Sequence, residues 1–153
     1  MFIFNIVSQH ANIVIFYFQR RVSDSVDFYR DWQPYVDGFG DADGNFWLGL
    51  ELIHQLTLEP SELKVTMEDD DGVVAIATYS SFSLGSAVTF YTLHVSGFSG
   101  VRTGDSLAYH DGAPFSARDQ DHDTHGGGHC SQMYLSAWWH KACTKITAYR
   151  SIW

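Results

Sequence analysis

Residues 26–50 read Val-Asp-Phe-Tyr-Arg-Asp-Trp-Gln-Pro-Tyr-Val-Asp-Gly-Phe-Gly-Asp-Ala-Asp-Gly-Asn-Phe-Trp-Leu-Gly-Leu. Phe28, Trp32 and Tyr35 recur at the spacing of one helix face, which predicts a short helix at this place. The glycines and aspartates that follow, at residues 37–44, predict a turn-rich loop. This stretch therefore indicates short elements separated by turns rather than long helices.

Outward from this stretch, apolar elements alternate with turns. Residues 46–56 predict a second helix, along one face of which lie Leu48, Leu52 and Leu56. Residues 63–68 alternate apolar and polar side chains, and residues 73–79 are rich in β-branched and aromatic types, so both predict strands. The acidic turn at residues 69–72 predicts that the two form a hairpin. Residues 90–95 are a further candidate strand.

The two ends of the chain differ from its middle. Residues 1–18 are strongly apolar, yet they lack the basic start and the small-residue cleavage site of a signal peptide. Polar residues also interrupt this run too often for a membrane span. We interpret residues 13–18 as a buried strand. From residue 97 onward regular patterning fades, so we predict one α+β domain whose second half is built from loops.

The composition limits the classes of function. The chain has 153 residues, the size of one ordinary domain, and 45% of them are apolar. Nine basic against eighteen acidic residues give a formal charge of −9, which excludes the basic surface that nucleic-acid binding needs. Anionic membranes are disfavoured for the same reason, whereas divalent cations suit such a surface. Cys130 and Cys143 fit one disulfide or two buried thiols, and composition leaves both open.

Residues 119–130, Asp-Gln-Asp-His-Asp-Thr-His-Gly-Gly-Gly-His-Cys, are the clearest candidate for a binding site. Alternate carboxylates on a tight loop can converge on one hard cation, and glycines let backbone carbonyls complete an oxygen shell. An EF-hand is excluded, because its glycine and glutamate positions hold Thr124 and Cys130. A solvated acidic loop is the alternative interpretation.

Two other chemistries are less favoured in this half of the chain. Zinc would need imidazoles or thiolates in a fixed geometry, and the available side chains are His122, His125, His129 and Cys130. Residues 104–107, Gly-Asp-Ser-Leu, spell the nucleophile block of GDSL hydrolases, and residues 119–122 imitate their Asp-x-x-His block. Only about a dozen residues separate the two blocks here, so we interpret Ser106 as a loop residue and predict no catalytic residue.

Trp138 and Trp139 are adjacent aromatic residues close to Cys143. We interpret them as part of the core, and the alternative is that they form the wall of a small apolar pocket.

Taken in order, these segments resemble the fibrinogen C-terminal domain shared by ficolins, tachylectins, angiopoietins, tenascins and the fibrinogen chains. The resemblance is carried by residues 19–22, 26–32, 35–41, 45–50, 53–57, 104–110, 115–116, 119–130 and 137–143. It implies a partial fibrinogen C-terminal domain at residues 18–143, between an unmatched apolar segment at 1–17 and an unmatched tail at 144–153. Residues 97–143 would form its loop-rich calcium and pocket region, beside a mixed or antiparallel sheet with short helices.

The resemblance also implies a set of site residues. Calcium (Ca²⁺) would be bound by the carboxylates of Asp121 and Asp123 and by the backbone carbonyls of about His125 and Gly127. Asp119 matches an aspartate that usually lies outside the group of direct ligands.

A disulfide would join Cys130 to Cys143, and the peptide bond before Cys143 would be cis. In the lectin branch of the family an acetyl group occupies a pocket beside the calcium loop. The matching parts here are the Tyr134 side chain and the backbone N–H groups of Cys143 and Thr144.

The departures from the family concern both ends. The first disulfide pair and the closing C-terminal strand, which in the family inserts into the main sheet, have no counterpart here. We expect an exposed sheet edge and marginal stability unless residues 1–18 or the tail substitute for that strand.

The function implied is that of a secreted, calcium-binding, lectin-like module that recognises acetylated glycans in innate immunity. The alternatives are a protein-binding adhesion or receptor-ligand module of the angiopoietin or tenascin type, or a copy that has lost ligand binding. No enzyme activity, nucleic-acid partner or membrane insertion is expected.

Overall fold

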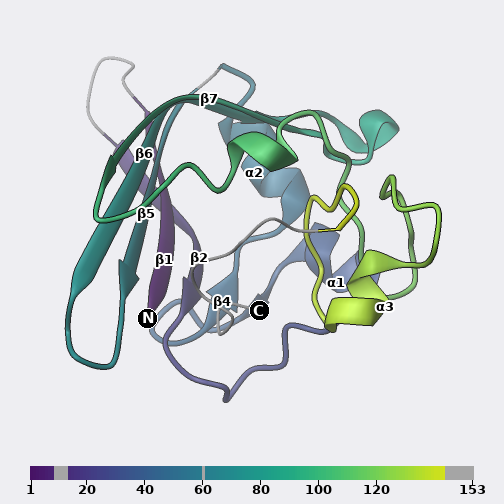
Figure 1. Ribbon diagram of the computed structural model, residues 1–153, viewed down its shortest axis with the longest axis horizontal. Coiled ribbons are helices and arrows are strands. Elements are labelled where there is room, and N and C mark those ends of the chain that lie inside the picture. Colours follow the sequence, from purple (N-terminus) through teal and green to yellow (C-terminus); the bar gives the residue numbers. More distant parts are fainter. Residues whose placement is uncertain (9–13, 60, 144–153) are drawn as a thin grey trace.

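The protein is described from a computed structural model that places residues 1–8, 14–59 and 61–143. Seven strands form one sheet in the order β3-β4-β2-β1-β5-β6-β7, and every neighbouring pair is antiparallel (Figure 1). The strands are β1 Phe2–Ser8, β2 Val14–Arg21, β3 Phe39–Gly40, β4 Phe46–Trp47, β5 Ser61–Glu68, β6 Val74–Leu84 and β7 Leu93–Val101. The helices are α1 Trp32–Asp37, α2 Leu50–Leu56 and α3 Cys130–Tyr134, with 3₁₀ turns η1 Ala87–Thr89 and η2 Ala108–His110. The predicted α+β class is confirmed.

The N-terminal segment supplies a central strand of this sheet. β1 pairs with β2 on one side and with β5 on the other, so its backbone is hydrogen-bonded along both edges. Phe2, Phe4 and Ile6 alternate along it and are buried in the core. Residues 2–8 thus fill the middle of the sheet, between β2 and β5.

The strand expected at residues 13–18 is β2, but it is longer and only one of its faces is buried. Phe18 is fully buried, whereas Ile15 and Tyr17 are half exposed on the opposite face. A β-bulge between β1 and β2 shifts the pairing near Phe18, so that Gln19 is buried next to it. The prediction of a buried strand was therefore wrong for the side chains of Ile15 and Tyr17.

Both predicted helices begin later than the sequence indicated. α1 begins at Trp32, and Phe28 lies before it in a segment without regular secondary structure. Phe46 belongs to β4, because it pairs with β2, and α2 begins only at Leu50. Gly49, directly before α2, has a φ of +110°, and a side chain there would approach the Val36 carbonyl to 2.8 Å, so glycine is needed at this position.

The apolar face predicted for the second helix is also corrected. Leu50 and Ile53 are its buried residues, whereas Leu52 is half exposed. The predicted strands at residues 63–68 and 73–79 and the turn between them are present, but the strands are longer, at Ser61–Glu68 and Val74–Leu84. The strand predicted at residues 90–95 begins later and runs further, as β7 at Leu93–Val101. It cannot begin at residue 90, because Phe90 and Tyr91, which follow η1, both have left-handed backbone angles.

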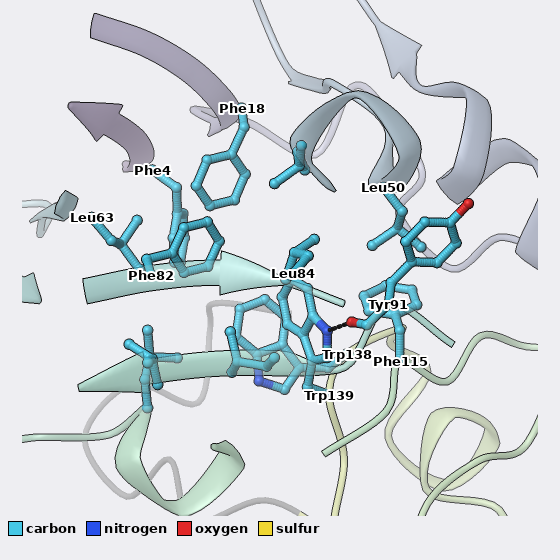
Figure 2. Close-up of a cluster of buried hydrophobic side chains, with 14 of the residues drawn as sticks. Phe4, Phe18, Leu50, Leu63, Phe82, Leu84, Tyr91, Phe115, Trp138 and Trp139 are labelled. Atoms are coloured by element: carbon cyan, nitrogen blue, oxygen red, sulfur yellow. Dashed lines mark hydrogen bonds between the residues drawn. The ribbon is translucent and has the colours of Figure 1, made fainter. Parts of the chain in front are cut away.

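Aromatic side chains join the sheet to the loops in one core (Figure 2). Phe18 from β2 stacks on Phe82 from β6, with ring centroids 5.6 Å apart and planes inclined by 6°. Trp138 and Trp139 are almost fully buried, and the Trp139 indole N–H donates to the Tyr91 carbonyl at 2.7 Å. The interpretation of this tryptophan pair as core is confirmed.

Candidate functional site

The aspartate loop, residues 119–130, is shaped by its own carboxylates. Asp123 Oδ1 accepts a hydrogen bond from the His125 backbone N–H at 2.7 Å, and its Oδ2 accepts one from the Cys130 N–H at 2.8 Å. Asp121 Oδ1 accepts from the Asp123 N–H at 3.2 Å. Hydrogen bonds to an ionised acceptor are stronger than neutral ones. The carboxylate of Asp123 therefore fixes both ends of the glycine-rich turn.

Ser116 joins this loop to the tryptophan segment. Its N–H and C=O both pair with Trp138, at 2.9 and 3.0 Å, and its hydroxyl oxygen accepts from the His122 N–H at 3.0 Å. The Ser131 hydroxyl also donates to the Ser116 carbonyl, at 3.1 Å. Ser116 is fully buried, so each of these bonds forms away from water. Ser116 entered the sequence analysis only as part of the resemblance, and its role in joining the loop to the tryptophan segment was not predicted.

The side chain of His122 contacts a backbone carbonyl and two aromatic rings. Its Nδ1 lies 2.7 Å from the Phe115 carbonyl, and its ring stacks on Phe90 with centroids 3.9 Å apart. The ring also makes an edge contact with Trp32 at 5.1 Å. His122 therefore packs the loop against its neighbours, and we do not count it among the candidate metal ligands.

A second connection runs from the loop to α1. Asp119 Oδ1 accepts from the Trp32 N–H at 2.7 Å, at the first residue of that helix. Arg118 forms two hydrogen bonds with Asp31, at 2.8 and 3.0 Å, and this contact lowers the pKa of the Asp31 carboxyl. The first N–H groups of a helix have no partner within it, so Asp119 fills that place. The sequence analysis placed Asp119 only outside the direct ligands and did not predict this bond, because Trp32 lies 87 residues away in the chain.

The predicted disulfide between Cys130 and Cys143 is present, with Cα atoms 5.4 Å apart. The peptide bond between Ala142 and Cys143 is cis, as the resemblance implied. Thr124 adds a bond between the same two segments, since its N–H donates to the Lys141 carbonyl at 3.1 Å. The aspartate loop and residues 140–143 therefore form one cross-linked unit.

Parts of the predicted acetyl pocket lie at either side of this disulfide. Tyr134 ends α3 and is half exposed, whereas Cys143 is buried. Thr144 lies outside the described residues. The pocket formed by these three residues thus stays a prediction.

The oxygen atoms near Asp121 and Asp123 fit a hard cation better than a soft one. Within the described ranges, no three His, Cys, Asp or Glu side chains are grouped to hold a metal, and Cys130 is oxidised. This removes the zinc alternative for that cysteine. A calcium ion would instead use the two carboxylates, whose hydrogen-bonded oxygens keep a free lone pair, together with backbone carbonyls. The Gly127 carbonyl accepts no hydrogen bond from any described residue, so it is available for this purpose.

The sequence analysis did not single out two buried histidines, His140 within this unit and His110, which contacts the preceding Trp139. His110 is fully buried with its Nδ1 2.8 Å from the Trp139 carbonyl, and burial lowers its pKa to about 4. His140 is nearly as buried, and burial lowers its pKa as well. Both rings are therefore neutral at physiological pH.

Residues 104–107, Gly-Asp-Ser-Leu, have a structural role. Asp105 Oδ1 accepts from the Tyr79 hydroxyl at 3.0 Å and from the Ala108 N–H at 3.0 Å, which ties η2 to β6. Ser106 makes no hydrogen bond to any histidine among the residues described. The geometry thus accounts for the aspartate and provides no base for the serine. No helix in the described parts of the chain is long and apolar enough to cross a membrane.

Comparisons with known proteins agree with this architecture. Human Ficolin-3 is 44% identical over 127 residues, which are 82% of this chain and 42% of the relative. Mouse Angiopoietin-related protein 7 is 43% identical over 126 residues, covering 82% of this chain and 37% of the relative. Chicken Tenascin is 43% identical over 130 residues, which are 84% of this chain and 7% of that protein. The chain thus spans less than half the length of these curated relatives.

Solved structures show the same fold. The fibrinogen-like globe domain of human ANGPTL6 superposes with a TM-score of 0.80 at 37% identity, over 88% of this chain and 66% of that one. A lamprey fibrin D-dimer, complexed with the peptide Gly-His-Arg-Pro-amide, has a TM-score of 0.73 at 26% identity, over 92% of this chain and 54% of that one. The sequence profile of the family described as "Fibrinogen beta and gamma chains, C-terminal globular domain" matches residues 8–150. The chain therefore belongs to the fibrinogen C-terminal domain family.

Proposed function

We propose that this protein is a secreted, calcium-binding recognition module with lectin-like affinity for acetylated glycans, and that it is not an enzyme. The implied setting is innate immune recognition outside the cell. The disulfide supports an oxidising compartment, because such bonds persist there and are rare in the cytosol. The formal charge of −9 favours cations over nucleic acid or anionic membranes.

The observation that carries this proposal is the aspartate loop itself. Asp121 and Asp123 are two residues apart and are joined by the 3.2 Å bond from the Asp123 N–H. In the same loop the Gly127 carbonyl accepts no bond from a described residue, and the His125 carbonyl accepts a long one from the Gly128 N–H at 3.4 Å. A calcium ion there would be bound by these carboxylates and by the carbonyls of His125 and Gly127. Its charge would offset the repulsion between the carboxylates and hold the loop in one shape.

Calcium would act on the ligand indirectly. The loop is cross-linked to Cys143 through Cys130, so fixing the loop also fixes the backbone beside Tyr134. The acetyl group would then contact Tyr134 and the backbone N–H groups of Cys143 and Thr144, in a pocket formed before the ligand arrives. The similarity to human Ficolin-3 supports this assignment.

A second candidate is a module that binds protein. Met133, Tyr134 and Leu135 are consecutive and exposed to 58, 52 and 63%, which makes an apolar patch at the end of α3. Apolar side chains grouped on a surface commonly mark contacts with other proteins. The similarity to Angiopoietin-related protein 7, and to a fibrin structure complexed with a peptide, also supports this alternative.

Calcium titration by calorimetry on the oxidised protein tests the first step. We expect saturable binding at one site, together with a melting temperature that rises with calcium concentration. Asp121→Asn should abolish both effects, because it removes a ligand charge while the bonds of Asp123 persist. Asp70→Asn is the matched control, since Asp70 is exposed on the β5–β6 turn.

Titration with N-acetylglucosamine, and with glucosamine as the non-acetylated control, tests the ligand. The lectin proposal requires binding of the acetylated sugar that weakens when calcium is chelated. Calcium binding without any sugar binding would favour the protein-binding candidate. Absence of calcium binding in a protein that melts cooperatively would overturn the calcium site.

A further inference from the structure

Phe90 and Tyr91, directly after η1, have an unusual backbone. Their φ angles are 52° and 50°, in the left-handed region that bulky side chains rarely adopt. Hydrogen bonds on both sides hold Phe90 there: its N–H donates to the Ala87 carbonyl at 3.0 Å, and its carbonyl accepts from the Phe115 N–H at 2.9 Å. The Tyr91 carbonyl accepts from the Trp139 indole N–H. A residue kept in a costly conformation by its surroundings points to a function for that conformation.

The Phe90 ring lies on His122 of the aspartate loop. The two rings are stacked, with centroids 3.9 Å apart and planes inclined by 18°. The Trp32 ring is nearly perpendicular to both, at centroid distances of 6.5 Å from Phe90 and 5.1 Å from His122. Phe90 is 43% exposed, so its ring contributes little to the core of the protein and mainly supports this local cluster.

A closed circuit of contacts joins Phe90, His122 and Phe115. The Phe90 ring stacks on the His122 ring, and the Phe115 N–H donates to the Phe90 carbonyl. The third contact is the 2.7 Å bond between His122 Nδ1 and the Phe115 carbonyl, in which Nδ1 is the donor because a carbonyl only accepts. The His122 backbone N–H is held separately, by the Ser116 hydroxyl at 3.0 Å. Each contact of the circuit limits the freedom of the other two, so loss of the Phe90 ring would loosen His122.

His122 lies between Asp121 and Asp123, the two carboxylates of the proposed calcium site. We propose that Phe90 is a positioning residue for that site: by holding His122, it keeps the chain between the two carboxylates ordered before an ion arrives. This role rests on the calcium binding proposed above, and Phe90 itself supplies no ligand. An ordered loop binds its ion more tightly, because binding then does not have to offset the entropy lost in ordering the loop.

Phe90→Ala tests this role, since it removes the ring but keeps a Cβ at the left-handed position. We expect the calcium Kd, measured by calorimetry, to rise several-fold and by no more than about tenfold, as the strength of one aromatic pair implies. One site should still titrate. In the calcium-free protein, hydrogen exchange should become faster at residues 119–125 and stay unchanged in β5 and β6. Phe90→Tyr keeps the ring and should restore both values, and Val88→Ala is the control in the same turn, at a position that is 88% exposed.

His122→Asn tests whether the ring acts through His122. In that background the stack is already lost, so Phe90→Ala should change the exchange at residues 119–125 far less than it does in the wild-type protein. Equal changes in the two backgrounds would overturn the role of Phe90, as would a Phe90→Ala variant with wild-type Kd and wild-type exchange. Faster exchange throughout β5 and β6 would also overturn it, because the ring would then support the whole fold.

Failure of the calcium site can be told apart from failure of this role. A wild-type protein that binds no calcium would overturn the calcium site, and exchange in calcium-free Phe90→Ala would still decide whether Phe90 orders the loop. A wild-type protein and a Phe90→Ala variant that bind calcium equally well would overturn the role of Phe90 and leave the site intact.

Discussion

The sheet half of the molecule, up to residue 101, and the loop half, residues 102–143, are held together by different interactions. In the sheet half, ladders of backbone hydrogen bonds carry apolar side chains such as Phe18 and Phe82 into a shared core. In the loop half, polar side chains hold the backbone: the Asp123 carboxylate accepts from two N–H groups and the Ser116 hydroxyl from one, and one disulfide closes the unit. The first arrangement spreads stability over many contacts, whereas the second concentrates it in a few polar groups.

The two halves should therefore lose stability in response to different changes. The sheet half should respond mainly to lost apolar volume and tolerate changes at its surface. The loop half should respond to charge, to pH and to the redox state of its cysteines.

Phe18→Ala should have the largest effect. The ring is fully buried and contacts Phe4, Trp47 and Phe82, so its removal leaves a cavity in the core. We expect the free energy of unfolding to fall by about 3–5 kcal/mol, as measured by chemical denaturation. Tyr17→Ala is the neighbouring control and should cost far less, because that side chain is half exposed. Similar losses in the two variants would contradict the division between buried and exposed faces of β2.

Replacing both Cys130 and Cys143 by alanine should lower the free energy of unfolding by about 3 kcal/mol, because the loop they close is short. Hydrogen exchange locates the effect. We expect faster exchange at residues 119–130 and little change in β5 and β6. Treating the wild-type protein with a reductant should reproduce the pattern. Equal loss of protection in the sheet would show that the two halves unfold as one unit.

Acid should destabilise the protein through His110. Its pKa is about 4 in the folded chain and about 6.5 in the unfolded chain, so below pH 6.5 the unfolded chain binds a proton that the folded chain does not. The free energy of unfolding should be unaffected above pH 6.5 and should fall by roughly 2 kcal/mol between pH 7 and pH 5. Chemical denaturation at several pH values measures this slope.

His110→Asn is the control for that slope. Its side-chain amide can still donate to the Trp139 carbonyl, but it does not titrate, so the slope between pH 7 and pH 5 should become shallower. His140 would supply the remainder, since burial also lowers its pKa. An unchanged slope in His110→Asn would assign the acid sensitivity to other groups.

Much of the sheet was predictable because its signals are local. The alternation at residues 63–68 and the acidic turn at 69–72 need no distant partner to be read. The place of β1 between β2 and β5 was not predictable, since strand pairing across sixty residues leaves no local pattern. Pairing of Phe46 with β2 likewise overrode its apparent helical spacing.

In the loop half, local spacing made Asp121 and Asp123 candidate ligands, which stays a prediction, and only the resemblance paired Cys130 with Cys143. Neither local spacing nor the resemblance predicted the bond that Asp119 makes. Its carboxylate reaches Trp32, and no pattern near residue 119 specifies that partner. The loops were therefore predictable as a place for a site, but the bonds that fix them to the rest of the fold were not.

Asp119→Ala should have the smallest effect of the series and tests the link between the halves. The Trp32 N–H at the start of α1 would lose its acceptor, which costs about 1 kcal/mol at a helix N-terminus. Asp70→Ala, on an exposed turn, should change stability by much less. Calcium titration of Asp119→Ala gives a second measurement. If Asp119 only anchors α1, calcium should still bind with nearly the wild-type stoichiometry, whereas loss of binding would make Asp119 a ligand rather than a connection between the loop and the helix.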